Sequence, residues 1–135
     1  MPGVRLAATS VVALLLAACS LLPVPAERIG LGNLTTAPVA VHVNGAWVGT
    51  YAPGALTEVA IGGHGGPPYV VEVRSPTGGL LAGITITTED AQAAAAGEMS
   101  MGSTAGLPCG AIHLQYGSPA EMPQADPAAV SGPCP

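Results

Sequence analysis

The chain contains no lysine and no phenylalanine, and only 8% of its 135 residues are charged. With no lysine and only three arginines it cannot build the basic patch with which nucleic-acid-binding proteins neutralise phosphates, so we expect no nucleic-acid partner. Aromatic residues are also few, with one tryptophan and three tyrosines. The core must therefore come from valine, isoleucine and leucine.

Glycine and proline are abundant instead, with 19 and 14 residues. Many turn-forming residues between short valine-rich runs favour strands joined by tight turns over long helices. The composition therefore predicts an all-β domain. We expect a small antiparallel β-sandwich, immunoglobulin-like or transthyretin-like, over residues 28–116.

The first 18 residues have the pattern of a signal peptide. Arg5 gives a positively charged start, and the apolar run at residues 11–16 is too short to span a membrane as a mature helix. The sequence that follows, Leu16, Ala17, Ala18 and Cys19, resembles the bacterial lipobox, in which the cysteine thiol receives diacylglycerol and becomes the new N-terminus. An ordinary secretory signal with an incidental cysteine is the alternative.

Removal of the first 18 residues would leave 117, enough for one domain. In that mature chain two arginines oppose eight aspartates and glutamates, a formal charge of −6. Acyl chains such as palmitate on Cys19 would hold the protein at the outer side of the cytoplasmic membrane without a spanning helix. Residues 19–27, with two prolines, are expected to form the lipidated tether.

Residues 39–61 are predicted to form three consecutive antiparallel strands. Asn44 and Gly45 suit a two-residue hairpin turn, and Pro53 and Gly54 suit the centre of a type II turn. This register would pair Val48 both with Val41 and with Val59. One face would carry Val39, Val41, Val43, Ala46, Val48, Thr50, Thr57, Val59 and Ile61. The other would carry His42, Trp47, Tyr51, Leu56 and Glu58.

Alternating apolar residues predict further strands at residues 28–34, 69–75, 80–88 and 109–116. A short helical turn is expected at residues 90–96 and an edge strand at residues 98–103. Residues 117–135 form a proline-rich tail. Cys109 and Cys134 remain once Cys19 is acylated, and an oxidising compartment favours a disulfide that ties this tail back. Reduced thiols or a metal pair are the alternatives.

The chain contains several short motifs, each of which occurs once: V-N-G at residues 43–45, A-P-G at 52–54, V-E-V-R-S-P-T-G at 71–78, and C-G at 109–110 with a late Cys134. In this combination the chain resembles a group of uncharacterised small secreted or lipid-anchored bacterial proteins. The hairpin is also similar to PEGA-type surface modules. The resemblance implies a compact β-sandwich and no known activity.

No catalytic motif is present, so we expect neither an enzyme nor a cofactor. A first candidate site is the face with His42, Trp47, Tyr51 and Leu56, which would be a binding patch if exposed. If a second sheet covers it, the same residues are core, and we favour this for Trp47. A second candidate is a copper site of Met99, Met101 and His113, because thioether and imidazole ligands select Cu(I).

The sequence thus predicts a non-catalytic, lipid-anchored cell-envelope protein that binds a ligand or has a structural role. Its partner could be an envelope protein or a polysaccharide. An extracytoplasmic copper-binding lipoprotein is the alternative.

The lipobox generates the first testable prediction. We expect the full-length protein to incorporate labelled palmitate in a bacterial host and to sediment with membranes. Cys19→Ala should abolish both properties, because the acylated thiol is removed. A wild-type chain that stays unlabelled would show that Cys19 is not lipidated.

Overall fold

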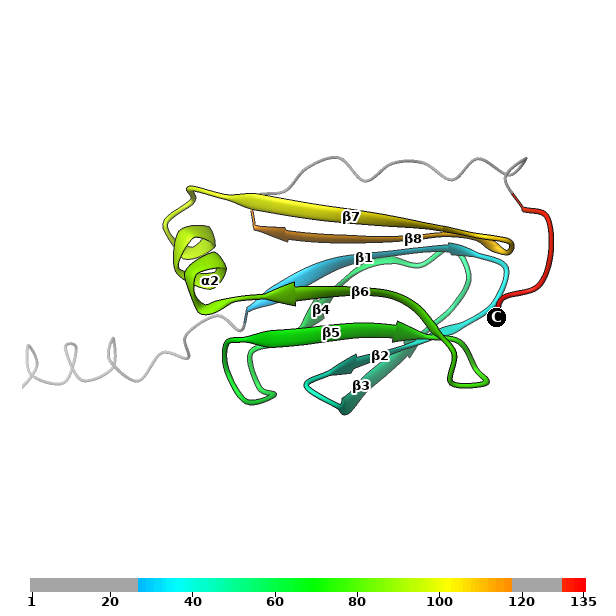
Figure 1. The fold of residues 1–135 in the computed structure, drawn as a ribbon, viewed down its shortest axis with the longest axis horizontal. Coiled ribbons are helices and arrows are strands. Elements are labelled where there is room, and N and C mark those ends of the chain that lie inside the picture. Colours follow the sequence, from blue (N-terminus) through cyan, green and yellow to red (C-terminus); the bar gives the residue numbers. More distant parts are fainter. Residues whose placement is uncertain (1–26, 118–129) are drawn as a thin grey trace, which may run out of the picture.

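The computed structural model describes residues 27–117 and 130–135 (Figure 1). The predicted signal peptide, Cys19 and the predicted tether as far as residue 26 lie outside the described residues. The strands are β1 (Arg28–Thr35), β2 (Val39–Val43), β3 (Ala46–Tyr51), β4 (Leu56–Ala60), β5 (Tyr69–Arg74), β6 (Leu80–Ile86), β7 (Ser100–Leu107) and β8 (Gly110–Gly117), with helix α2 (Thr88–Ala95) between β6 and β7. Sheet A has the order β4-β1-β8-β7 and sheet B the order β3-β2-β5-β6.

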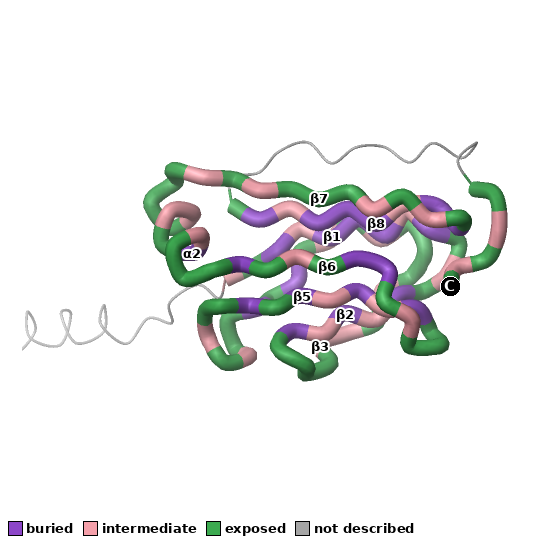
Figure 2. Tube along the Cα trace, in the orientation of Figure 1, coloured by how far each residue is buried: buried purple, intermediate pink, exposed green. Residues whose placement is uncertain are grey.

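The two sheets form a sandwich whose core consists of aliphatic side chains. Buried residues alternate with exposed ones along several strands (Figure 2), as two faces of a pleated strand require. The largest fully buried side chains are Ile29, Leu31, Ile61, Ile86, Ile112, Leu114, Val39, Val41, Val43, Val59, Val71 and Val73. The all-β fold and the core of valine, isoleucine and leucine are therefore confirmed.

The first predicted hairpin forms, but its register changes partway. Asn44 and Gly45 have the positive φ angles of the predicted turn, 50° and 82°, and His42 opposes Trp47. Beyond that pair the register shifts, so that Val41 opposes Gly49 instead of Val48. Such a β-bulge moves every later side chain to the other face.

Because of the bulge, Thr50 and Tyr51 each lie on the opposite face from the one predicted, so that prediction is wrong for both residues. Tyr51 opposes Val39 and packs against the core, whereas Thr50 opposes Ala40 and is exposed. Gly49 makes this possible, because a Cβ at Gly49 would lie 2.9 Å from the Tyr51 hydroxyl. A glycine at position 49 thus gives the tyrosine ring the room to turn inward.

The third predicted strand belongs to the other sheet. β4 pairs with β1 in sheet A, where Val59 opposes Ile29, and it does not pair with β3. The predicted turn is present, since Gly54 has φ 81° and the Ala55 amide donates to the Ala52 carbonyl at 3.1 Å. It carries the chain from sheet B to sheet A instead of closing a two-residue hairpin, for which a type II turn is not the usual connection.

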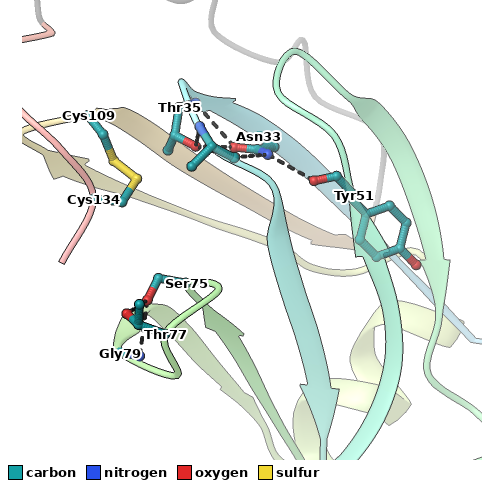
Figure 3. Close-up of a disulfide and its surroundings, with 9 residues drawn as sticks. Asn33, Thr35, Tyr51, Ser75, Thr77, Gly79, Cys109 and Cys134 are labelled. Atoms are coloured by element: carbon teal, nitrogen blue, oxygen red, sulfur yellow. Dashed lines mark hydrogen bonds between the residues drawn. A yellow bond between two sulfur atoms is a disulfide. The ribbon is translucent and has the colours of Figure 1, made fainter.

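Asn33 of β1 holds this crossover turn (Figure 3). Its amide nitrogen Nδ2 donates to the carbonyls of Ala37, Tyr51 and Ala52 at 3.0–3.1 Å. Its Oδ1 accepts from the Thr35 hydroxyl at 2.6 Å. Its backbone N–H donates to the Ala55 carbonyl at 2.8 Å, and its carbonyl accepts from the Gly54 amide at 2.7 Å. The side chain is fully buried.

The remaining elements agree with the sequence analysis in place and type. β5 buries Tyr69, Val71 and Val73, and the Cys109–Cys134 disulfide is formed. The helix is longer than the expected single turn because a capping box of Thr87 and Asp90 starts it. Within residues 27–117 and 130–135 no helix is long and apolar enough to cross a membrane.

Asn33 gives a stability prediction. Asn33→Ala removes the donor from three carbonyls, so we expect the free energy of unfolding to fall by about 3 kcal/mol. Asn33→Asp should be worse at neutral pH, because burial raises the pKa of the introduced carboxyl. The folded variant then holds a proton that the unfolded chain releases near pH 4, and stability falls as pH rises above about 4.

Urea unfolding at several pH values measures both effects. The exposed helix residue Gln92 supplies the control, since Gln92→Ala should change stability by less than about 0.5 kcal/mol. If Asn33→Ala proved as mild as this control, the crossover would not depend on the asparagine.

Candidate functional site

The structure divides the predicted patch between the two sheets. His42 and Trp47 oppose each other on the outer side of sheet B, but Leu56 lies on β4 of sheet A and Tyr51 is turned toward the core. Trp47 is 62% exposed. Our expectation that a second sheet buries this tryptophan is therefore wrong, and the exposed part of the patch is smaller than predicted.

Two cross-strand rows form the outer face around Trp47. In one row His42 lies between Trp47 of β3 and Glu72 of β5, and in the other Ala40 lies between Thr50 and Arg74. Directly opposed residues share a face and stand close together. We call these six residues the Trp47 face: Trp47, His42, Glu72, Thr50, Ala40 and Arg74.

Arg74 is held in place at one side of the Trp47 face. Its guanidinium pairs with the carboxylate of Glu72 and donates to the Gly78 carbonyl at 2.8 Å. These two bonds use two of the five guanidinium N–H groups. The planar group is therefore fixed by described residues and still has donors for a ligand.

A pocket of about 560 Å³ opens beside these rows. Ala40 is small, so the face is hollowed between Thr50 and Arg74. The lining residues are Pro38, Val39, Ala40, His42, Thr50, Arg74, Ser75, Pro76 and Gly78. Sequence reasoning missed this pocket, because its lining comes from three strands and two turns whose pairing no local motif reveals.

The turn at residues 75–79 borders the pocket and is itself braced (Figure 3). The Ser75 hydroxyl accepts from the Gly79 amide at 3.1 Å and bonds the Thr77 hydroxyl at 3.0 Å. Pro135 packs on this turn, because a Cβ at Gly79 would lie 3.0 Å from the Pro135 carbonyl oxygen. The disulfide next to Pro135 thus fixes a neighbour of the pocket.

The predicted copper ligands do not come together. Met101 opposes Tyr116 and packs against the core, so it lies on the inner side of sheet A. His113 opposes Thr104 on the outer side, with its Nδ1 2.7 Å from the Thr104 hydroxyl. Met99 precedes β7. In the described part of the chain no three His, Cys, Asp or Glu residues form a metal-binding group either.

The chain enters the sandwich at the end away from the pocket. The Glu27 carbonyl accepts from the Ile61 amide at 2.8 Å, and Glu27 lies beside Tyr116 and the last residues of α2. From there β1 runs to the turn that leads to Pro38 (Figure 1). Its eight residues span about 25 Å, which separates the entry point from the pocket.

No protein-family model matches the chain, and no curated protein and no solved structure matches it. Function must therefore be inferred from the chemistry of the Trp47 face. An exposed indole, a fixed guanidinium–carboxylate pair and a pocket can bind a ligand through stacking and hydrogen bonds.

The three tyrosines of the chain give a prediction for high pH. Burial raises the pKa of Tyr51, Tyr69 and Tyr116, and for Tyr69 a hydrogen bond to Glu27 and nearby charge raise the pKa further, to about 12. Unfolded tyrosines ionise near pH 10, so the folded state holds protons that the unfolded state loses. Stability should therefore fall as pH rises above about 10.

Tyrosinate absorbance measures the ionisation directly. We expect the native protein to show less than half-ionised tyrosine at pH 10, and the protein in denaturant to show about half. Glu27→Gln should move the Tyr69 step to lower pH and leave that of Tyr51 in place. Native absorbance that already matches the denatured protein would contradict the burial of these rings.

Proposed function

We propose that this protein is a non-catalytic, lipid-anchored binding module of the cell envelope that uses the Trp47 face to hold its ligand. The main observation behind this proposal is that Trp47 is exposed and lies opposite His42, which lines the pocket. Covering an exposed indole with a binding partner removes a large apolar surface from water, which favours binding. Tryptophans are accordingly frequent at the centres of binding sites.

Two features support a position outside the cytoplasm. Residues 16–19 resemble a lipobox, which supports acylation of Cys19. The Cys109–Cys134 disulfide fits an oxidising compartment, since disulfides persist there and are rare in the cytosol. Both features come from separate parts of the chain.

The position of Glu27 supports a ligand site that faces away from the membrane. A lipid on Cys19 would bring the Glu27 end of the sandwich nearest to the bilayer. The pocket lies near the other end of β1, about 25 Å away. A hollow of 520 Å³ at Arg28 and Glu58 lies beside the entry point instead, on the other sheet from Trp47, so it is the weaker candidate.

Site-specific photo-crosslinking tests this proposal in intact cells. A diazirine amino acid replaces Thr50, which is exposed and lines the pocket, or Leu56, which is exposed on sheet A. We expect a discrete adduct from position 50 and none from position 56. Adding Trp47→Ala should reduce the adduct at position 50, because the stacking partner is lost.

Equal labelling from both positions, or none from position 50, would overturn the assignment of the binding face. The diazirine reacts with C–H and O–H bonds alike, so protein and glycan partners are both detected. The full-length anchored chain is used throughout, so that the site keeps its position relative to the membrane.

A further inference from the structure

The chemistry of the Trp47 face also indicates a class of ligand. We propose that it binds a neutral oligosaccharide segment, with one sugar ring stacked on Trp47 and hydroxyl groups bonded to Glu72 and Arg74. This inference rests on the proposed function and narrows it. Three properties of the face carry it: the surroundings of the indole, the charge and the donor–acceptor set.

Most neighbours of the indole on the outer face are polar, and the nearest exposed aliphatic residue of β5 is Val70, two residues before Glu72. The two rows contain His42, Glu72, Thr50 and Arg74, and Ala40 is the one aliphatic member. Leu80, which is exposed, lies beyond Arg74 at the far edge of the sheet. A protein hot spot is usually ringed by contacts that exclude water. A sugar instead offers a C–H face to an aromatic ring and hydroxyl groups to its surroundings.

Charge favours a neutral ligand. Glu72 and Arg74 neutralise each other on this face, and the chain after position 18 carries a formal charge of −6. Phosphate-rich polymers would meet net repulsion, and a cationic peptide would have to compete with Arg74 for the carboxylate. A neutral polyhydroxylated chain meets neither obstacle.

The polar groups suit hydroxyl groups, which both donate and accept. Arg74 can only donate and the carboxylate of Glu72 can only accept, so the two groups together match the hydroxyl groups of one ligand. Trp47 and Glu72 are the two ends of one row, two inter-strand spacings apart, which is about 10 Å, and Arg74 lies in the next row. That distance is longer than one sugar ring, so the ligand should be an oligosaccharide.

Trp47 is the single tryptophan of the chain, so intrinsic tryptophan fluorescence reports on this face alone. The full-length protein, in a zwitterionic detergent without a sugar head group, is titrated with chitotetraose, cellotetraose and maltotetraose. We expect a saturable change in emission with at least one of them. An unchanged emission with all three would overturn the proposal.

Matched arginine variants separate the site from the rest of the surface. Arg74→Gln should weaken binding at least tenfold, because its ligand donors are lost. Arg28→Gln removes the other folded-domain arginine, which pairs with Glu58 at 3.8 Å on sheet A, and should leave the affinity unchanged. Equal effects of both substitutions, or none of Arg74→Gln, would contradict the assignment.

Arg74 also supports the turn at residues 75–79, so Arg74→Gln could weaken binding by disturbing that turn. A further variant tests the site without this complication. Thr50 is exposed, so Thr50→Gln should fold normally and place a longer side chain over the pocket. It should also weaken glycan binding. If no glycan binds but the position-50 crosslinker captures a protein, the ligand class is wrong and the binding face stands. If neither occurs, both proposals fail.

Discussion

The buried amide of Asn33 is the interaction on which the two-sheet arrangement depends. The chain leaves sheet B at Tyr51 and enters sheet A at Leu56, so the carbonyls between them cannot join a regular strand ladder. A buried carbonyl without a partner costs about 1–3 kcal/mol. The Asn33 side chain supplies donors to Tyr51 and Ala52, and its backbone bonds Gly54 and Ala55. One residue of β1 thus makes the crossover possible.

A second constraint acts at the same end of the sandwich (Figure 3). The Cys109–Cys134 disulfide joins residues 25 apart in sequence, which stabilises by about 3 kcal/mol in chain-entropy models. Around it the amides of Ser131 and Gly132 donate to the Pro108 carbonyl at 2.6 and 2.9 Å. Pro135 then rests against the turn that borders the pocket. Turns otherwise move more than strands, so these bonds give the pocket a fixed wall.

Local signals in the sequence were sufficient for most elements and insufficient for their assembly. Asn44 and Gly45 predicted a hairpin because both tolerate positive φ, and the disulfide followed from two remaining cysteines. Pro53 and Gly54 predicted the turn correctly, but a turn type does not determine which sheet receives the next strand. That choice depends on Asn33, which is 20 positions earlier and has no helical or strand periodicity to reveal its role. The crossover also separated Leu56 from the rest of the predicted patch, whereas the bulge turned Tyr51 inward.

The bulge at Val48, which has no partner on β2, links the core to the candidate site. Without it Val39 would oppose Thr50, and a hydroxyl would point into the aliphatic core, where it needs a partner. Tyr51 would then stand on the outer face, over the small Ala40 that leaves the pocket open. The extra residue reverses both side chains at once: Tyr51 packs inside, and Thr50 lines the pocket. Trp47 precedes the bulge and keeps its outward direction. The same irregularity therefore completes the core and leaves one exposed aromatic ring beside an open pocket, which is the combination that a stacking ligand requires.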